Sequence, residues 1–192
     1  ARGVVAIAGL RIRVAGAAPE RGGPYVIVAN HASLLDVPVL AAVIPIRFHF
    51  ASRPHYFRVP FLGWGMRAAG TVKLDPERPR DAAGALASFA ARFRRGACLL
   101  LFPEGSRTPD GRLGRYKRGA FLAAIDHRVA VLPVALSGLF RAMPRGSRRV
   151  RPGEVTVTIG SPIPTGELAA GDARDLASRA ESWTRTALTA SP

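Results

Sequence analysis

The chain of 192 residues has a single cysteine, Cys98, so no disulfide bond can form within it. Its four histidines and one cysteine lack the spacing of a zinc site, and we expect no bound metal. The sequence also lacks a Gly-x-x-x-x-Gly-Lys loop for nucleotide phosphates and a Gly-x-Ser-x-Gly turn for a nucleophilic serine. These absences argue against zinc enzymes, nucleotide hydrolases and serine hydrolases.

Long apolar runs and lysines are scarce as well. No apolar run approaches the ~18 residues that a membrane-spanning helix requires. Lys73 and Lys117 are the only lysines among 28 basic residues, and with 13 acidic residues the net charge is +15. Such a charge attracts phosphate groups on nucleic acids, anionic membranes or small substrates. The arginines are scattered and no nucleic-acid-binding signature accompanies them, so we expect no nucleic-acid partner.

Short β-rich apolar runs alternate with helical patterns, which predicts an α/β fold with a mostly parallel central sheet flanked by helices. We expect a single domain over residues 1–192, with a motif-bearing core at about 10–165 and a C-terminal helix at about 168–188. The glycine- and aromatic-rich stretch 54–70 is expected to be irregular. Strands are expected at 10–14, 25–29, 48–51, 71–74, 97–102, 129–136 and 155–159, and further helices at 34–44, 80–95 and 116–126.

The first chemistry-bearing motif is Asn-His-Ala-Ser-Leu-Leu-Asp at residues 30–36, directly after the expected strand 25–29. A turn would bring His31 and Asp36 together, so that the carboxylate fixes one ring nitrogen and leaves the other free as a general base. The alternative is a helix N-cap cluster, in which Asn30 or Ser33 caps the helix and Asp36 favours its dipole. For this motif in isolation, the capping interpretation is favoured.

The second motif is Phe-Pro-Glu-Gly-Ser-Arg-Thr at residues 102–108, at the end of the expected strand 97–102. Ligand sites in open α/β sheets gather at the carboxyl ends of strands. Arg107 is suited to forked contacts with phosphate, and Gly105 lets the backbone approach a ligand. The alternative is a surface turn with a weak ion pair between Glu104 and Arg107.

In this order, and about seventy residues apart, the two motifs resemble those of the glycerolipid acyltransferase family, which includes the lysophosphatidate acyltransferases. The family's hallmarks are Asn-His-x-x-x-x-Asp followed by Phe-Pro-Glu-Gly. Further segments are similar to the family at 60–64 with 70–75, at 117–120 and at 131–135. The resemblance covers roughly residues 10–165.

One segment departs from the family's pattern. In the family, the intermediate block usually ends in an Asp-Arg-like pair whose arginine holds the acceptor phosphate. Here Asp75 is followed by Pro-Glu-Arg, so Arg78 is the candidate and Arg80 a second option. Arg53 stands before the aromatic part of this block, where a lysine is common.

The resemblance implies an O-acyltransferase that moves a fatty acyl chain from acyl-CoA or acyl carrier protein to the free hydroxyl of lysophosphatidate, giving phosphatidate. His31 would act as the general base and Asp36 would orient it. The thioester is a co-substrate, and no cofactor is expected. The implied acceptor site comprises Arg78, Glu104, Gly105, Ser106 and Arg107, with Glu104 orienting an arginine.

The implied partners are an acyl thioester donor, a lysolipid acceptor and an anionic membrane surface. We expect the protein at the cytoplasmic face of a membrane, either peripheral or anchored by a segment upstream of Ala1. Another lysolipid, such as a lyso-ornithine lipid or a lysophospholipid, is an alternative acceptor. A non-catalytic basic module that binds lipid or nucleic acid is an alternative of another class. The aromatic stretch 57–64 fits the core, an acyl tunnel or a membrane interface.

Overall fold

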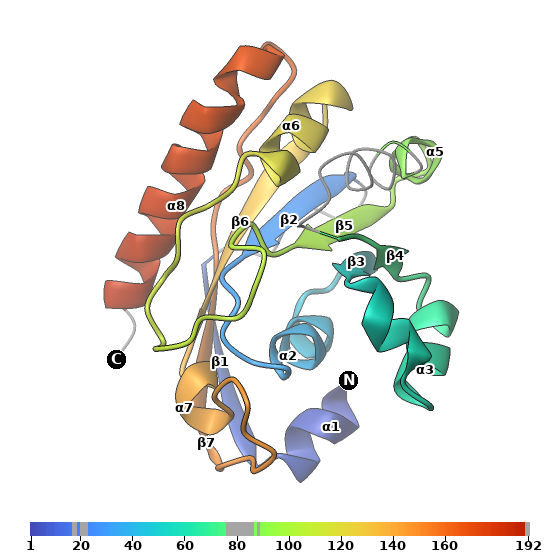
Figure 1. Cartoon of the computed structure of the whole chain (residues 1–192). Helices are drawn as coiled ribbons and strands as arrows, with labels where there is room; N and C mark the ends of the chain where they lie inside the picture. The colour runs from blue at the N-terminus through green and yellow to red at the C-terminus, as the bar shows by residue number, and fades with distance from the viewer. Residues whose placement is uncertain (17–18, 20–22, 76–86, 88, 191–192) are drawn as a thin grey trace.

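The computed structural model describes residues 1–16, 19, 23–75, 87 and 89–190. These residues form a seven-stranded sheet in the order β1-β7-β6-β2-β5-β3-β4 (Figure 1). All neighbouring strands are parallel except β6 and β7, which confirms the predicted α/β fold with a mostly parallel sheet. The strands are β1 (Leu10–Gly16), β2 (Tyr25–Ala29), β3 (Phe48–Ser52), β4 (Val72–Lys73), β5 (Cys98–Leu101), β6 (Ala130–Ser137) and β7 (Gly153–Ile159).

Helices cover both faces of this sheet (Figure 1). In the central strand β2, Val26 and Val28 pack toward α6 and α8, whereas Ile27 and Ala29 pack toward α1 and α2. Burial on both faces explains why the central strands are continuous apolar runs rather than alternating ones. The helices are α1 (Arg2–Ile7), α2 (Asp36–Val43), η1 (Pro54–Arg58), α3 (Leu62–Ala68), α5 (Ala90–Phe93), α6 (Gly119–Asp126), α7 (Leu139–Ala142), η2 (Ala170–Asp172) and α8 (Ala173–Thr189).

The stretch 54–70 is not irregular, as its composition suggested, but forms the 3-10 helix η1 and the α-helix α3. Gly63 lies inside α3, where a Cβ atom would approach the carbonyl oxygen of Phe57 to 2.3 Å. This glycine therefore permits close packing between η1 and α3. The prediction failed because a glycine needed for helix packing looks the same in sequence as one that breaks a helix.

Three other expectations concern where helices begin and end. Half of the helix expected at 80–95 lies outside the described residues, as do Arg78 and Arg80, and α5 lies in its described part. The expected helix at 116–126 begins only at Gly119. The expected C-terminal helix is divided into η2 and α8. The domain boundaries stay a prediction.

Because β2, β3 and β5 are parallel, their carboxyl ends lie at one edge of the sheet. The chain leaves β2 at Asn30, β3 at Arg53 and β5 at Phe102. The two sequence motifs are thereby brought to the same edge.

Candidate active site

His31 follows β2, and its imidazole is held by a carboxylate at the start of α2. The ring nitrogen Nδ1 lies 2.6 Å from Oδ2 of Asp36, a residue with no exposed surface. The same oxygen accepts hydrogen bonds from the backbone N–H groups of Ala32 at 2.8 Å and Ser33 at 3.0 Å. Since the carboxylate only accepts, this pairing favours the tautomer in which Nδ1 carries the proton.

The other ring nitrogen of His31, Nε2, is left available for chemistry. It has no hydrogen-bond partner among the residues that the structure describes, and 21% of the side chain is exposed. Phe102 stacks on the imidazole with ring centroids 3.9 Å apart and an interplanar angle of 13°. The imidazole is thus fixed by a carboxylate on its edge and by a ring on its face, with Nε2 able to accept a proton.

The capping interpretation of the first motif holds in part, beside the pairing of His31 with Asp36. The Oγ atom of Ser33 accepts from the N–H of Leu35 at 3.2 Å, and Asp36 in the first turn of α2 accepts from the N–H of Ser33 at 3.0 Å. The amide of Asn30 donates to the carbonyl of Leu136 at 3.0 Å and accepts from its N–H at 2.7 Å. Asn30 therefore continues the pairing of β2 with β6 one step past the strand end and sets where His31 leaves the sheet.

Glu104 ties the second motif to the first. Its Oε1 accepts from the N–H of His31 at 2.6 Å, and its Oε2 accepts from the N–H of Gly114 at 2.8 Å. The N–H of Thr108 donates in turn to the carbonyl of His31 at 2.8 Å. Through these contacts Glu104 positions the backbone of His31. Arg78 lies outside the described residues, so the expectation that Glu104 orients an arginine stays a prediction.

Burial raises the pKa of Glu104 to about 7. The two backbone N–H donors oppose this shift, because they stabilise the charged form, while the nearby carboxylates of Asp36 and Glu181 add to it. Desolvation outweighs the two hydrogen bonds. The carboxyl group behind His31 therefore changes its charge near neutral pH.

Cations surround the loop that carries the second motif. Gly105 has a φ of +78°, which favours glycine, and its carbonyl accepts from Nη2 of Arg53 at 3.4 Å. The ammonium of Lys117 lies against this glycine, only 2.8 Å from where a Cβ atom would be. The carbonyl of Arg107 accepts from Nη1 of Arg145 at 3.4 Å. This loop is suited to an anionic ligand.

The structure gives less information on the other predicted site residues. Ser106 is exposed, and Arg78 lies outside the described residues, so the acceptor-binding roles stay predictions. Sequence reasoning assigned no role to Phe102, although it opens the second motif. It also missed Arg145, for which the basic loop 141–151 was the only signal.

Two negative findings apply to the described ranges. Within them, no three or more His, Cys, Asp or Glu side chains lie close enough to hold a metal ion. Nor does any helix of those ranges combine the length and the apolar character needed to cross a membrane.

The sequence profile of the acyltransferase family matches residues 11–137, a range that includes both motifs and the strands that present them. The chain belongs to this family, as the resemblance of its motifs predicted.

Similar proteins within the family carry the name of one activity. A chloroplastic 1-acyl-sn-glycerol-3-phosphate acyltransferase of Arabidopsis thaliana is 39% identical over 146 residues, which is 76% of this chain and 41% of that protein. The human 1-acyl-sn-glycerol-3-phosphate acyltransferase alpha is 30% identical over 89% of this chain and 61% of its own length. The chain thus spans less than half of the plant relative.

A solved structure matches over nearly the whole chain. The crystal structure of the 1-acyl-sn-glycerophosphate acyltransferase PlsC from Thermotoga maritima superposes with a TM-score of 0.82 at 25% identity. The match covers 98% of this chain and 76% of that one.

Proposed function

We propose that this protein is an O-acyltransferase that moves a fatty acyl chain from a thioester carrier to the free hydroxyl of lysophosphatidate, giving phosphatidate. The observation that carries the proposal is the pair of His31 and the buried Asp36, with Nε2 left free. The relatives from Arabidopsis thaliana and human, both named 1-acyl-sn-glycerol-3-phosphate acyltransferases, support the same acceptor.

The reaction proceeds by direct transfer. The acceptor hydroxyl gives its proton to Nε2 of His31 while its oxygen attacks the thioester carbonyl carbon. Asp36 stabilises the imidazolium that forms. When the tetrahedral intermediate collapses, the carbon–sulfur bond breaks, and the departing thiolate takes the proton from His31. General base action of this kind contributes roughly 10²–10⁴-fold in rate.

The loop 102–108 supplies the site for the acceptor phosphate. Arg107 and Lys117 bring positive charge to it, and the backbone of Gly105 allows close approach. Arg78 remains part of this proposed site on the resemblance alone. Glu104 acts through the backbone of His31 and is therefore a positioning residue.

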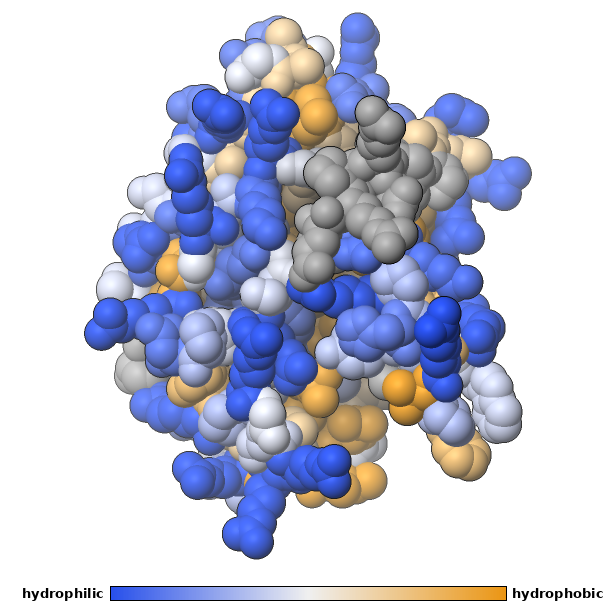
Figure 2. All heavy atoms as spheres, in the orientation of Figure 1, coloured by the Kyte–Doolittle hydropathy of each residue, from blue (hydrophilic) through white to orange (hydrophobic). Residues whose placement is uncertain are grey.

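We also propose that the protein associates with an anionic membrane, at the cytoplasmic face of that membrane. On α3 and the turn before it, Phe61 is 80% exposed and Trp64 is 64% exposed, and their rings contact each other. Figure 2 shows apolar side chains at the end of the molecule where α1 and α3 lie, amid a largely hydrophilic surface. Aromatic rings beside basic residues are favoured at the interface of an anionic bilayer.

The test is acyl transfer by the purified protein from labelled acyl-CoA, and separately from acyl carrier protein, to lysophosphatidate. We expect product with the wild type and a loss of at least about 100-fold in His31→Ala. The matched control is His127→Ala, which removes a histidine at the end of α6. Circular dichroism verifies that both variants fold.

Each other outcome has a defined meaning. Equal activity in His31→Ala would refute the mechanism but keep the reaction. Product formed only with a lyso-ornithine lipid or a lysophospholipid would show that this lipid, and not lysophosphatidate, is the acceptor. No product with any lysolipid and either donor would overturn the enzymatic proposal in favour of a binding module.

A further inference from the structure

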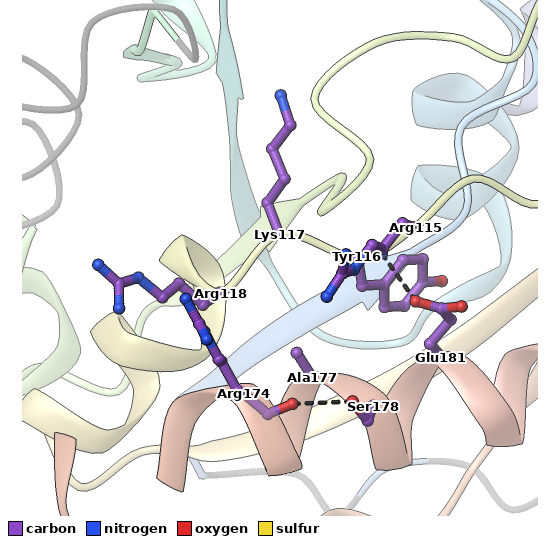
Figure 3. A pocket seen from close by; sticks show the side chains of 8 residues that line it. All are labelled: Arg115, Tyr116, Lys117, Arg118, Arg174, Ala177, Ser178 and Glu181. Carbon is purple, nitrogen blue, oxygen red and sulfur yellow. Dashed lines mark hydrogen bonds between the residues drawn. The ribbon is translucent and has the colours of Figure 1, made fainter. Parts of the chain in front are cut away.

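A groove of about 660 Å³ lies between the segment that precedes α6 and the flank of α8 (Figure 3). Arg115, Lys117 and Arg118 line it from the segment before α6, and Arg174 from α8. In Figure 3, the side chains of Arg118 and Arg174 lie on the same side of the groove, while Lys117 extends away from α8. Its volume is in the range of small-molecule sites.

The positive charge of this groove is not compensated by the described residues. Glu181 is the one acidic side chain in its lining, and it accepts hydrogen bonds from the N–H of Tyr116 at 2.9 Å and from Arg185 at 3.0 Å. Within the described ranges, none of the four cations forms an ion pair with a carboxylate. Like charges gathered in one groove repel each other, and a bound polyanion relieves that repulsion.

The wall that carries these cations is fixed in place. Tyr116 is buried, and its hydroxyl donates to Oγ1 of Thr184 on α8 at 3.1 Å. Together with the bond from its N–H to Glu181, this holds the segment before α6 against α8. Cations presented by a rigid segment lose less conformational freedom when they bind a ligand.

The groove is connected to the catalytic histidine through one loop. The N–H of Lys117 donates to the carbonyl of Pro103 at 2.9 Å, and its ammonium lies against Gly105. The neighbouring Glu104 holds the backbone of His31. The groove and the site of His31 are therefore joined by the loop that carries Glu104.

We propose that this groove binds the phosphates of the coenzyme A portion of the acyl donor, an inference that rests on the proposed acyl transfer. The planar guanidinium matches phosphate oxygens in a forked geometry. Coenzyme A carries its phosphates on the nucleotide and the thioester at the far end of its pantetheine arm. Acyl carrier protein has one phosphodiester on that arm, so the three arginines that line the groove fit coenzyme A better.

The direct test is calorimetric titration of the protein with coenzyme A, 3′-dephospho-coenzyme A and pantetheine. We expect the wild type to bind coenzyme A tightest and pantetheine weakest. The double variant Arg118→Ala/Arg174→Ala weakens coenzyme A binding about tenfold, because two charge-assisted contacts are lost. Its affinity for pantetheine stays unchanged. The control Arg94→Ala/Arg179→Ala removes two exposed arginines outside the groove lining and behaves as the wild type.

A kinetic arm separates the donor from the acceptor. In the groove variant, KM for acyl-CoA rises about tenfold, while KM for lysophosphatidate and kcat stay within about twofold of the wild type. Equal coenzyme A affinity in wild type and variant overturns the inference. A rise confined to KM for acyl carrier protein also overturns it, and would indicate a protein partner. A rise confined to KM for lysophosphatidate overturns it as well.

The two proposals fail separately. Loss of coenzyme A binding in the groove variant of a protein that transfers no acyl group would refute the proposed function and support the groove. Normal acyl transfer by the groove variant, with an unchanged KM for acyl-CoA, would support the proposed function and overturn the inference about the groove.

Discussion

At the scale of single residues, the site depends on the contacts that surround the buried side chain of Asp36. It is fully buried, yet it faces the ring of His31 and two backbone N–H groups. Donors placed around a carboxylate replace the water that burial removes. The same three contacts also fix the direction of the imidazole.

Asp36→Asn should lower kcat about 100-fold or more while leaving KM for both substrates nearly unchanged. The amide keeps the size of the side chain but cannot stabilise an imidazolium as a carboxylate does. Steady-state acyl transfer measures this. The control is Asp126→Asn, at an exposed position at the end of α6, and it should retain full activity. A loss smaller than about threefold in Asp36→Asn would contradict the assigned role.

Glu104 should make the stability of the protein depend on pH. Its folded-state pKa of about 7 lies above the ordinary value of 4.5. A raised carboxyl pKa means that the folded state holds the proton more tightly than the unfolded state does. The stabilisation is thus fully present below pH 4.5 and is lost as the pH rises through about 7. It amounts to about 3 kcal/mol.

Urea unfolding at several pH values between 5 and 8 tests this. The free energy of unfolding of the wild type should fall with rising pH more steeply than that of Glu104→Gln, which cannot ionise. Glu167→Gln, at an exposed position, should keep the wild-type slope. Identical slopes in wild type and Glu104→Gln would show that Glu104 does not titrate in this range.

At the scale of elements, α3 and the turn that precedes it carry an unusual combination of strain and exposure. Phe61 has a φ of 60°, which is rare for a bulky residue and costs of order 1–3 kcal/mol. The strain presents the ring to solvent, where it contacts Trp64. Exposed aromatic rings of this kind gain free energy when they enter an apolar phase.

Phe61→Ser/Trp64→Ser should weaken binding to anionic vesicles about tenfold, since two aromatic rings are no longer transferred from water. Cosedimentation with the vesicles measures the affinity, and the melting temperature should not fall. Val14→Ser removes an exposed apolar side chain on the edge strand β1 and should bind like the wild type. Unchanged binding of the double variant would exclude this surface as the membrane contact.

At the scale of the whole molecule, the net charge of +15 determines how the protein meets a membrane. Binding to vesicles that contain anionic lipid should weaken steeply as salt is raised from about 0.1 M to 1 M, because the screening length falls from ~10 Å to ~3 Å. Vesicles of neutral lipid, measured in parallel, should bind weakly at every salt concentration. Salt-independent binding would show that apolar contacts alone hold the protein there.

Local sequence was a sound guide to the central strands but a poor one to the segment after β3. The apolar run at β2 predicted a buried strand with its observed bounds, because a strand covered on both faces has no polar side. In α3, glycines suggested irregular chain, whereas the structure uses Gly63 for contact with Phe57. Whether a glycine serves a turn or a close approach depends on a neighbour that the sequence does not identify.

The sequence by itself determined the α/β fold, the family and the two motifs, because apolar patterning and short motifs are local properties. Only the tertiary structure decided which groups those motifs contact. It showed that Asn30 pairs with β6, and that Glu104 accepts a hydrogen bond from the backbone N–H of His31. It also brought Arg118 and Arg174 to the same groove. Each of these contacts joins residues more than fifty positions apart, and sheet order and helix packing alone set which distant groups meet.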